Sequence, residues 1–138
     1  MPHDKNDFSI NTIIGPNANL TGDVEINGFT RVDGSIRGNV KAKGRIVIGE
    51  RARIKGNVSG TNITVGGVVC GNVIADGHFI LLSTGVVIGD IITRRIQADD
   101  GSFINGRVVV CTNDEGWAKT TSEYKDAQGI RSALPVFR

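Results

Sequence analysis

The segment Ala52-Arg-Ile-Lys-Gly-Asn-Val58 carries a short pattern that organises the whole chain. The pattern reads small residue, any residue, aliphatic, any residue, glycine, Asp/Asn/Arg, then Val or Ile. It occurs six times, and successive copies place their glycines 16, 18, 15, 18 and 17 residues apart. Six copies at this spacing indicate a structural repeat of about 17 residues. The repeating glycines are Gly22, Gly38, Gly56, Gly71, Gly89 and Gly106.

The composition favours strands as the structure of each repeat. The 138 residues include 32 Ile and Val but only 12 Leu and Ala, and 19 are glycine. Branched side chains suit a pleated strand, whereas helical bundles favour Leu and Ala. Between copies of the pattern lie further apolar segments at 45–48, 62–65 and 78–81. Each unit is therefore expected to carry about three short strands separated by Gly and Asn/Asp turns.

A unit of three very short strands cannot bury its own apolar side chains, so the copies are expected to stack. Stacked coils lay strand on strand at about 4.8 Å per layer and share one continuous core. Coils of irregular length break the six-residue phase of left-handed hexapeptide helices, which favours a right-handed helix with three sides. We predict an all-β, right-handed, three-sided parallel β-helix of about six coils over residues 11–111. Residues 1–10 and 112–138 lack the repeat and are expected to be flexible tails.

The aliphatic residues that flank the glycines are predicted to point inward and form the core repeat. Those assigned to it are Leu20, Val24, Ile36, Val40, Ile54, Val58, Val69, Val73, Val87 and Ile91. Asn39, Asn57 and Asn72 fall at one place in consecutive coils. They either form a hydrogen-bonded ladder between coils or recur for their backbone preference in a turn.

Charge and cysteine content exclude several classes of protein. A net charge of +2 does not indicate a nucleic-acid binder, and Cys70 and Cys111 make neither a disulfide framework nor a zinc site. The first ten residues lack the apolar region of a secretory signal, so a cytoplasmic location is expected. No metal site, cofactor or phosphate loop is predicted, and Asp99-Asp100-Gly101 is interpreted as a turn.

Between Arg37 and Lys55 the chain has seven basic residues and one acid, Glu50. This segment either forms a surface for anionic lipid or an acidic partner, or consists of ordinary solvated strand positions. Because it spans a whole coil, its charges are expected to ring the solenoid rather than form one flat patch.

The opening Thr12-Ile-Ile-Gly-Pro-Asn-Ala-Asn-Leu-Thr-Gly-Asp-Val24, followed by coils with Gly-Asn-Val, resembles the bactofilins, bacterial cytoskeletal proteins. The resemblance covers about residues 11–111. It implies a non-enzymatic scaffold that polymerises end to end without nucleotide into non-polar filaments. Its expected partners are further copies of itself and proteins of cell-wall synthesis or cell shape. The resemblance also implies weak association with the inner face of the membrane.

The two open ends of the solenoid are the expected polymer contacts, because each exposes strand edges and one apolar layer. The predicted contact residues are Thr12, Ile14, Phe103, Ile104, Val108 and Val110. Phe103 either dominates the C-terminal contact or faces outward, since Ile104 holds the repeating inward position.

Two other functions compete with the scaffold. A β-helical acyltransferase of the hexapeptide-repeat type would need a general base, and His78 is the one histidine within the repeats. Its alignment with Arg45 predicts an outward side chain. The remaining alternative is a solenoid adaptor that does not polymerise.

Overall fold

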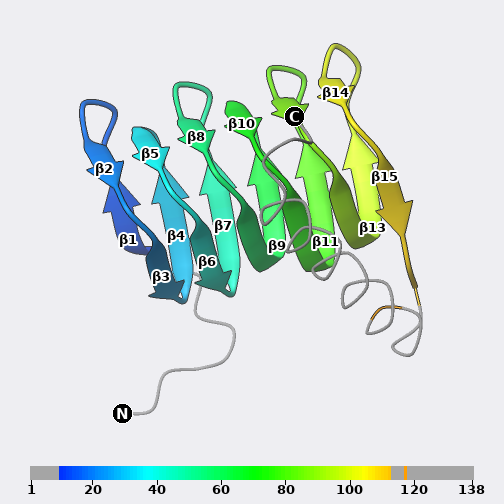
Figure 1. The fold of residues 1–138 in the computed structure, drawn as a ribbon, viewed down its shortest axis with the longest axis horizontal. Helices are drawn as coiled ribbons and strands as arrows, with labels where there is room; N and C mark the ends of the chain where they lie inside the picture. The colour runs from blue at the N-terminus through cyan, green and yellow to red at the C-terminus, as the bar shows by residue number, and fades with distance from the viewer. Residues whose placement is uncertain (1–9, 113–116, 118–138) are drawn as a thin grey trace, which may run out of the picture.

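The computed structural model describes residues 10–112 and Trp117 (Figure 1). Regular structure between Ile10 and Val110 is entirely β-strand. The first strand begins at Ile10, one residue before the predicted start of the solenoid. The rest of the predicted tails, 1–9, 113–116 and 118–138, lies outside the described residues. No helix in the described part of the chain is long and apolar enough to cross a membrane.

The strands stack into a coil with three faces, and every strand pair is parallel. The second face is a six-stranded sheet made of β2 (Asn19–Thr21), β5 (Ser35–Arg37), β8 (Arg53–Lys55), β10 (Val68–Cys70), β12 (Val86–Ile88) and β14 (Phe103–Asn105). The first face begins with β1 (Ile10–Ile14), β4 (Phe29–Val32) and β7 (Arg45–Ile48). The third face comprises β3 (Val24–Asn27), β6 (Val40–Lys43) and, at the far end, β15 (Val108–Val110).

From the third coil onward, the third and first faces are joined by single bent strands. These are β9 (Val58–Val65), β11 (Val73–Leu81) and β13 (Ile91–Ala98). The register shifts between Ala75 and His78, where β11 turns from the third face to the first. The prediction of three separate strands per unit therefore holds only for the early coils, because later coils continue their hydrogen bonding around this corner.

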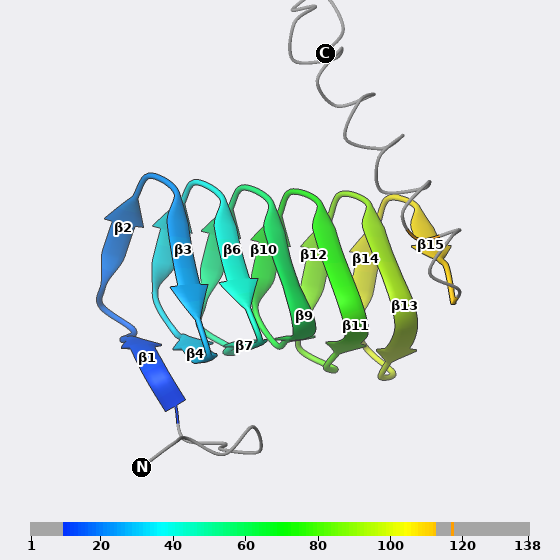
Figure 2. The ribbon, with the colours of Figure 1, turned by 90° about the horizontal axis from the view of Figure 1, so that it is seen from below.

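The coil is right-handed, as predicted. In Figure 2 the second-face strands rise behind, the chain crosses the top toward the viewer, and the third-face strands descend in front. The chain advances from left to right during each such turn, which defines a right-handed helix. Six coils follow one another from β1 to β15.

The core is a column of inward side chains shared by all three faces. Eight of the ten core-repeat residues are at most 1% exposed. Leu20 and Val24 occupy the same inward register as Ile36 and Val40, yet Leu20 is 38% exposed. The difference arises because they belong to the first coil, and no described coil lies beyond them.

The repeating glycines stack as a column at the corner between the second and third faces. Gly56 has a φ of +152°, and a Cβ there would overlap the carbonyl oxygen of Gly38 in the preceding coil. The backbone of Gly56 also donates to the carbonyl of Cys70 at 3.0 Å. A residue with a side chain would therefore be both strained and too close to its neighbour, which explains the repeat.

The asparagine ladder is confirmed, with the backbone amide as its donor. The Asn57 amide donates to Asn39 Oδ1 at 3.0 Å, and the Asn72 amide donates to Asn57 Oδ1 at 2.9 Å. Asp23 and Asp90 extend the same ladder with their carboxylate oxygens, so that it runs from Asp23 to the Arg107 amide. These hydrogen bonds tie all six coils together along one corner.

Candidate functional site: the two ends of the solenoid

Both ends of the solenoid expose strand edges. Within the described residues, β2 pairs only with β5, and β14 pairs only with β12. On the third face, β3 pairs only with β6 and β15 only with β13 in the same part of the chain. Each end thus presents backbone donors and acceptors to any further parallel or antiparallel strand.

The N-terminal end shows the inner layer of the first coil. Ile14 is buried, Leu20 is exposed, and Val24 is half-buried. Ile26 shares this layer because its register partner is the buried Ala42. The polar member is Thr12, which is paired with the fully buried Thr30. The predicted Thr12 and Ile14 therefore lie at this end.

The C-terminal end shows the inner layer of the last coil. Ile104 is half-buried and pairs with the buried Val87. Val108 and Val110 are 40% and 46% exposed although they occupy inward register positions. The predicted Ile104, Val108 and Val110 therefore lie together on this end.

Sequence reasoning missed two members of these layers. Ile26 and Ile96 lie outside the glycine pattern, in the third-face strand β3 and in the part of β13 that belongs to the first face. The alignment of strands could have found Ile96, because it pairs with the fully buried Phe79.

Phe103 lies on the last strand of the second face but points away from the core. Its neighbour Ile104 takes the inward position, and Phe103 is 53% exposed. Of the two placements considered from sequence, the structure shows the outward one. Its part in a polymer contact stays a prediction, since its ring sits beside the end layer rather than within it.

The asparagine ladder ends differently at the two ends. Asp23 begins it with a carboxylate whose Oδ1 accepts from the Asn39 amide at 3.0 Å. Arg107 closes it by donating its amide to Asp90 Oδ1 at 3.0 Å. The Arg107 side chain carries no oxygen, and its guanidinium lies 3.6 Å from Asp90 Oδ2. The ladder therefore has no side-chain acceptor to offer at the C-terminal end.

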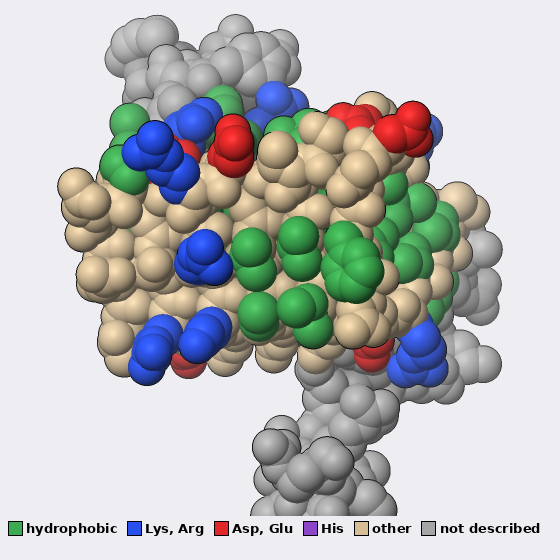
Figure 3. Space-filling view, turned by 90° about the horizontal axis from the view of Figure 1, so that it is seen from above, with side chains coloured by type: hydrophobic (Ala, Val, Ile, Leu, Met, Phe, Trp, Pro, Cys, Tyr) green, Lys and Arg blue, Asp and Glu red, His purple; other side chains and the backbone are tan. Residues whose placement is uncertain are grey.

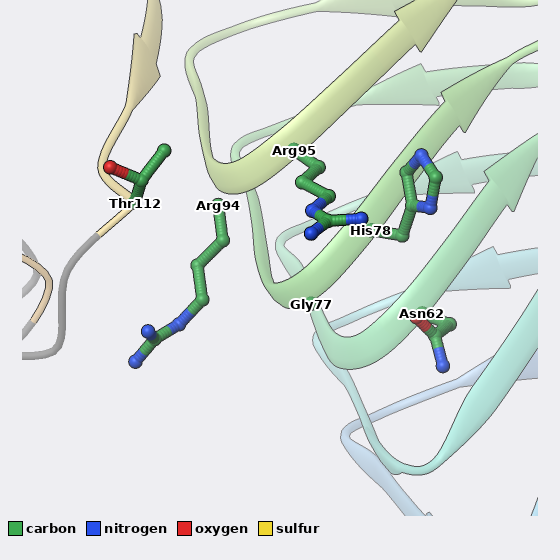
Figure 4. Close-up of a pocket in the computed structure, with 6 residues that line it drawn as sticks. All are labelled: Asn62, Gly77, His78, Arg94, Arg95 and Thr112. Atoms are coloured by element: carbon green, nitrogen blue, oxygen red, sulfur yellow. The ribbon is translucent and has the colours of Figure 1, made fainter.

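The histidine considered as a catalytic base lies on the outer surface. His78 pairs in register with Asn62, which pairs with Arg45, so the predicted alignment is confirmed. It lines a depression of about 450 Å³ with Asn62, Gly77, Arg94, Arg95 and Thr112 (Figure 4). Arg94 points away from the imidazole and bonds Asp76 at 2.8 Å. The residues that line this depression include no carboxylate to orient a catalytic imidazole.

Asp99-Asp100-Gly101 forms the turn between β13 and β14, as interpreted from sequence. The Ser102 hydroxyl donates to the Asp99 carbonyl at 2.7 Å, and Gly101 has a φ of +94°. The described residues contain no group of His, Cys, Asp and Glu that could hold a metal ion.

A sequence model of the family described as "Bactofilin: Polymer-forming cytoskeletal" matches residues 12–109, which is nearly the whole solenoid. The chain belongs to the bactofilin family. Relatives within the family include two bactofilins of Myxococcus xanthus. BacP is 32% identical over 98 residues, which make up 71% of this chain and 41% of BacP. BacO is 26% identical over 98 residues, or 78% of its length.

The bactofilin fold is also matched by a solved structure. A cryo-EM reconstruction of Thermus thermophilus bactofilin double helical filaments superposes with a TM-score of 0.68 and 25% sequence identity. The match covers 72% of this chain and 99% of that protein. The shared part is therefore the solenoid, whereas the matched segment spans less than half of BacP.

Proposed function

We propose that this bactofilin is a nucleotide-independent cytoskeletal scaffold that polymerises by end-to-end stacking of its solenoid. The observation that carries the proposal is the pair of apolar end layers, each bordered by free strand edges. The Thermus thermophilus bactofilin is described as forming double helical filaments, which supports polymerisation of this chain through the shared fold. By the same resemblance, the polymer positions cell-wall or cell-shape proteins at the inner face of the membrane.

The favourable free-energy contributions to an end-to-end contact are similar in size to the cost of association. Joining two ends adds several backbone hydrogen bonds, each of about 1 kcal/mol net. Leu20 at one end and Val108 and Val110 at the other contribute about 1 kcal/mol or more each when buried. This gross gain is comparable with the association cost of roughly 4–15 kcal/mol. Stable polymers therefore need the complete layer, and loss of one large side chain is enough to weaken them.

The two ends of the ladder favour non-polar filaments. In a head-to-tail junction the Asp23 amide of one copy would meet the Arg107 side chain of the next copy. All steps of the ladder within one chain have a side-chain oxygen at that position, whereas Arg107 has none. That junction would interrupt the ladder and leave an amide without its side-chain acceptor. Like-to-like junctions, N-terminal end on N-terminal end and C-terminal end on C-terminal end, do not require the missing acceptor.

Negative-stain microscopy of the purified chain, without added nucleotide, tests the proposal. We expect long filaments whose formation is unchanged by ATP, GTP or a chelator of divalent cations. Discrete trimers would contradict it in favour of the acyltransferase architecture, and monomers at all concentrations would favour the adaptor.

A further inference from the structure

The outer surface of the second face is divided into a basic part and an apolar part. Each of its six strands contributes two outward positions, on either side of one inward residue. In β10, β12 and β14 these positions hold a nearly continuous apolar patch, which consists of Val68, Cys70, Val86, Ile88 and Phe103. In β5 and β8 they hold a basic patch, which consists of Arg37, Arg53 and Lys55.

Figure 3 views this face directly and shows two rows of hydrophobic side chains, continued toward the N-terminal coils by Lys and Arg. The rows follow the strand register. One row runs from Arg53 through Val68 and Val86 to Phe103, and the other runs from Lys55 through Cys70 and Ile88. Ile88 and Phe103 are 45% and 53% exposed. The basic residues between Arg37 and Lys55 ring the solenoid as expected, because Lys41 and Lys43 lie on the third face and Arg45 on the first. The three on the second face lie next to the apolar patch.

None of the outward positions on these six strands holds an acidic residue. The nearest acids, such as Glu50 and Asp99, lie in the turns that border the face. This arrangement disfavours a second copy as the covering partner. Full overlap of two such faces would set guanidinium and ammonium groups against each other or against apolar side chains, with no carboxylate to neutralise them.

We infer that the outer surface of the second face binds an anionic lipid bilayer. A bilayer offers both chemistries in one flat surface: phosphates for Arg37, Arg53 and Lys55, and the acyl boundary for Ile88, Phe103 and their neighbours. Three cations and a small apolar patch bind weakly as one unit. In the proposed end-to-end polymer the face recurs in every subunit, so that many weak contacts act together. This multivalent part of the inference rests on the proposed polymerisation.

Co-sedimentation with vesicles tests the inference. The full chain is mixed with vesicles of phosphatidylcholine and phosphatidylglycerol, or of phosphatidylcholine alone, and filaments are scored by electron microscopy in the same samples. We expect binding to the anionic vesicles that falls as salt is raised, and much weaker binding to the neutral ones.

Two pairs of variants assign the binding to this face. Arg53→Gln with Lys55→Gln is matched by Lys41→Gln with Lys43→Gln, which removes the same charge from exposed positions of the third face. Ile88→Ser is matched by Ile80→Ser on the outside of the first face. The second-face variants should bind anionic vesicles at least about tenfold less tightly and still form filaments, whereas their matched variants should bind like the parent chain.

Three results would overturn the inference and leave the proposed polymerisation standing. The first is filaments that do not bind anionic vesicles. The second is equal loss of binding in the matched variants. The third is unchanged vesicle binding by the second-face variants; if these variants also lose side-by-side filament pairing, the face is assigned to a second copy. Failure of the proposed polymerisation is distinguishable from these results, because the parent chain would then form no filaments either with or without vesicles.

Discussion

At the scale of the residue, alternation along each short strand determines which side chains point into the core and which point outward. In β8, Ile54 is 1% exposed and inside the column, while Lys55 beside it is exposed on the second face. The glycine pattern predicted this alternation, because an aliphatic residue lies two positions before each repeating glycine. It failed only where no neighbouring coil covers the layer, as at Leu20, since burial there depends on a partner that the sequence of one chain does not contain.

Ile54→Asp should destabilise the solenoid strongly. It places an unpaired carboxylate in a stacked apolar layer, and we expect a loss of about 3–5 kcal/mol in the free energy of unfolding. Lys55→Asp, one residue away and exposed beside Arg37 and Cys70, should change stability by about 0.5 kcal/mol or less. Thermal unfolding followed by circular dichroism compares the two. Similar small shifts in both variants would show that the inward assignment is incorrect.

Gly56→Ala tests the glycine column with the smallest possible side chain. The added Cβ would adopt an unfavourable φ and overlap the Gly38 carbonyl oxygen, so we expect a loss of about 2 kcal/mol or more. Gly15→Ala is a suitable control, because nothing lies within 4 Å of its added Cβ. If Gly56→Ala melts at the temperature of the parent chain, the corner must be able to open without cost.

At the scale of the element, the sequence predicted the strands and their stacking better than their connections. The repeating Asn residues indicated one corner, and the structure makes that corner a ladder in which each side-chain oxygen accepts a backbone amide of the next coil. The continuity of β9 and β11 was not predicted, because Gly60 and Gly77 within those strands resemble turn signals in sequence. The apolar patch on the second face was also missed, since it depends on which coils lie side by side.

Asn57→Ala should remove one step of the ladder, and Asn57→Asp should keep it. The alanine variant leaves the Asn72 amide without its acceptor at 2.9 Å, which costs about 1 kcal/mol. That loss corresponds to a fall in Tm of a few degrees for a domain of this size, roughly 2–5 °C. Differential scanning calorimetry of both variants checks the result. An aspartate variant that melts as early as the alanine variant would argue against the acceptor role.

At the scale of the whole molecule, the solenoid is a column with a covered core and two ends whose outer strand edges pair with no other described strand. Deletion of residues 113–138 should leave this column folded and able to assemble. One contact that it removes is the half-buried Arg94 guanidinium over the Trp117 ring at 5.1 Å, a cation–π contact worth about 0.5–2 kcal/mol. Circular dichroism and electron microscopy of the truncated chain test this. A folded truncation that no longer forms filaments would place a polymer contact in the deleted segment.

The central claim is that like ends meet like ends, and the mass of a chain blocked at one end tests it most directly. Leu20→Arg places a charge in the N-terminal end layer, where the side chain is already 38% exposed and the fold can accept it. Light scattering coupled to size-exclusion chromatography should then give a dimer, about twice the 14.7 kDa of one chain, joined through the untouched C-terminal ends. Val110→Arg should likewise give a dimer through the N-terminal ends, and the double variant a monomer. Monomers from both single variants would show head-to-tail stacking, and long polymers from the double variant would show that the ends are not the contact at all.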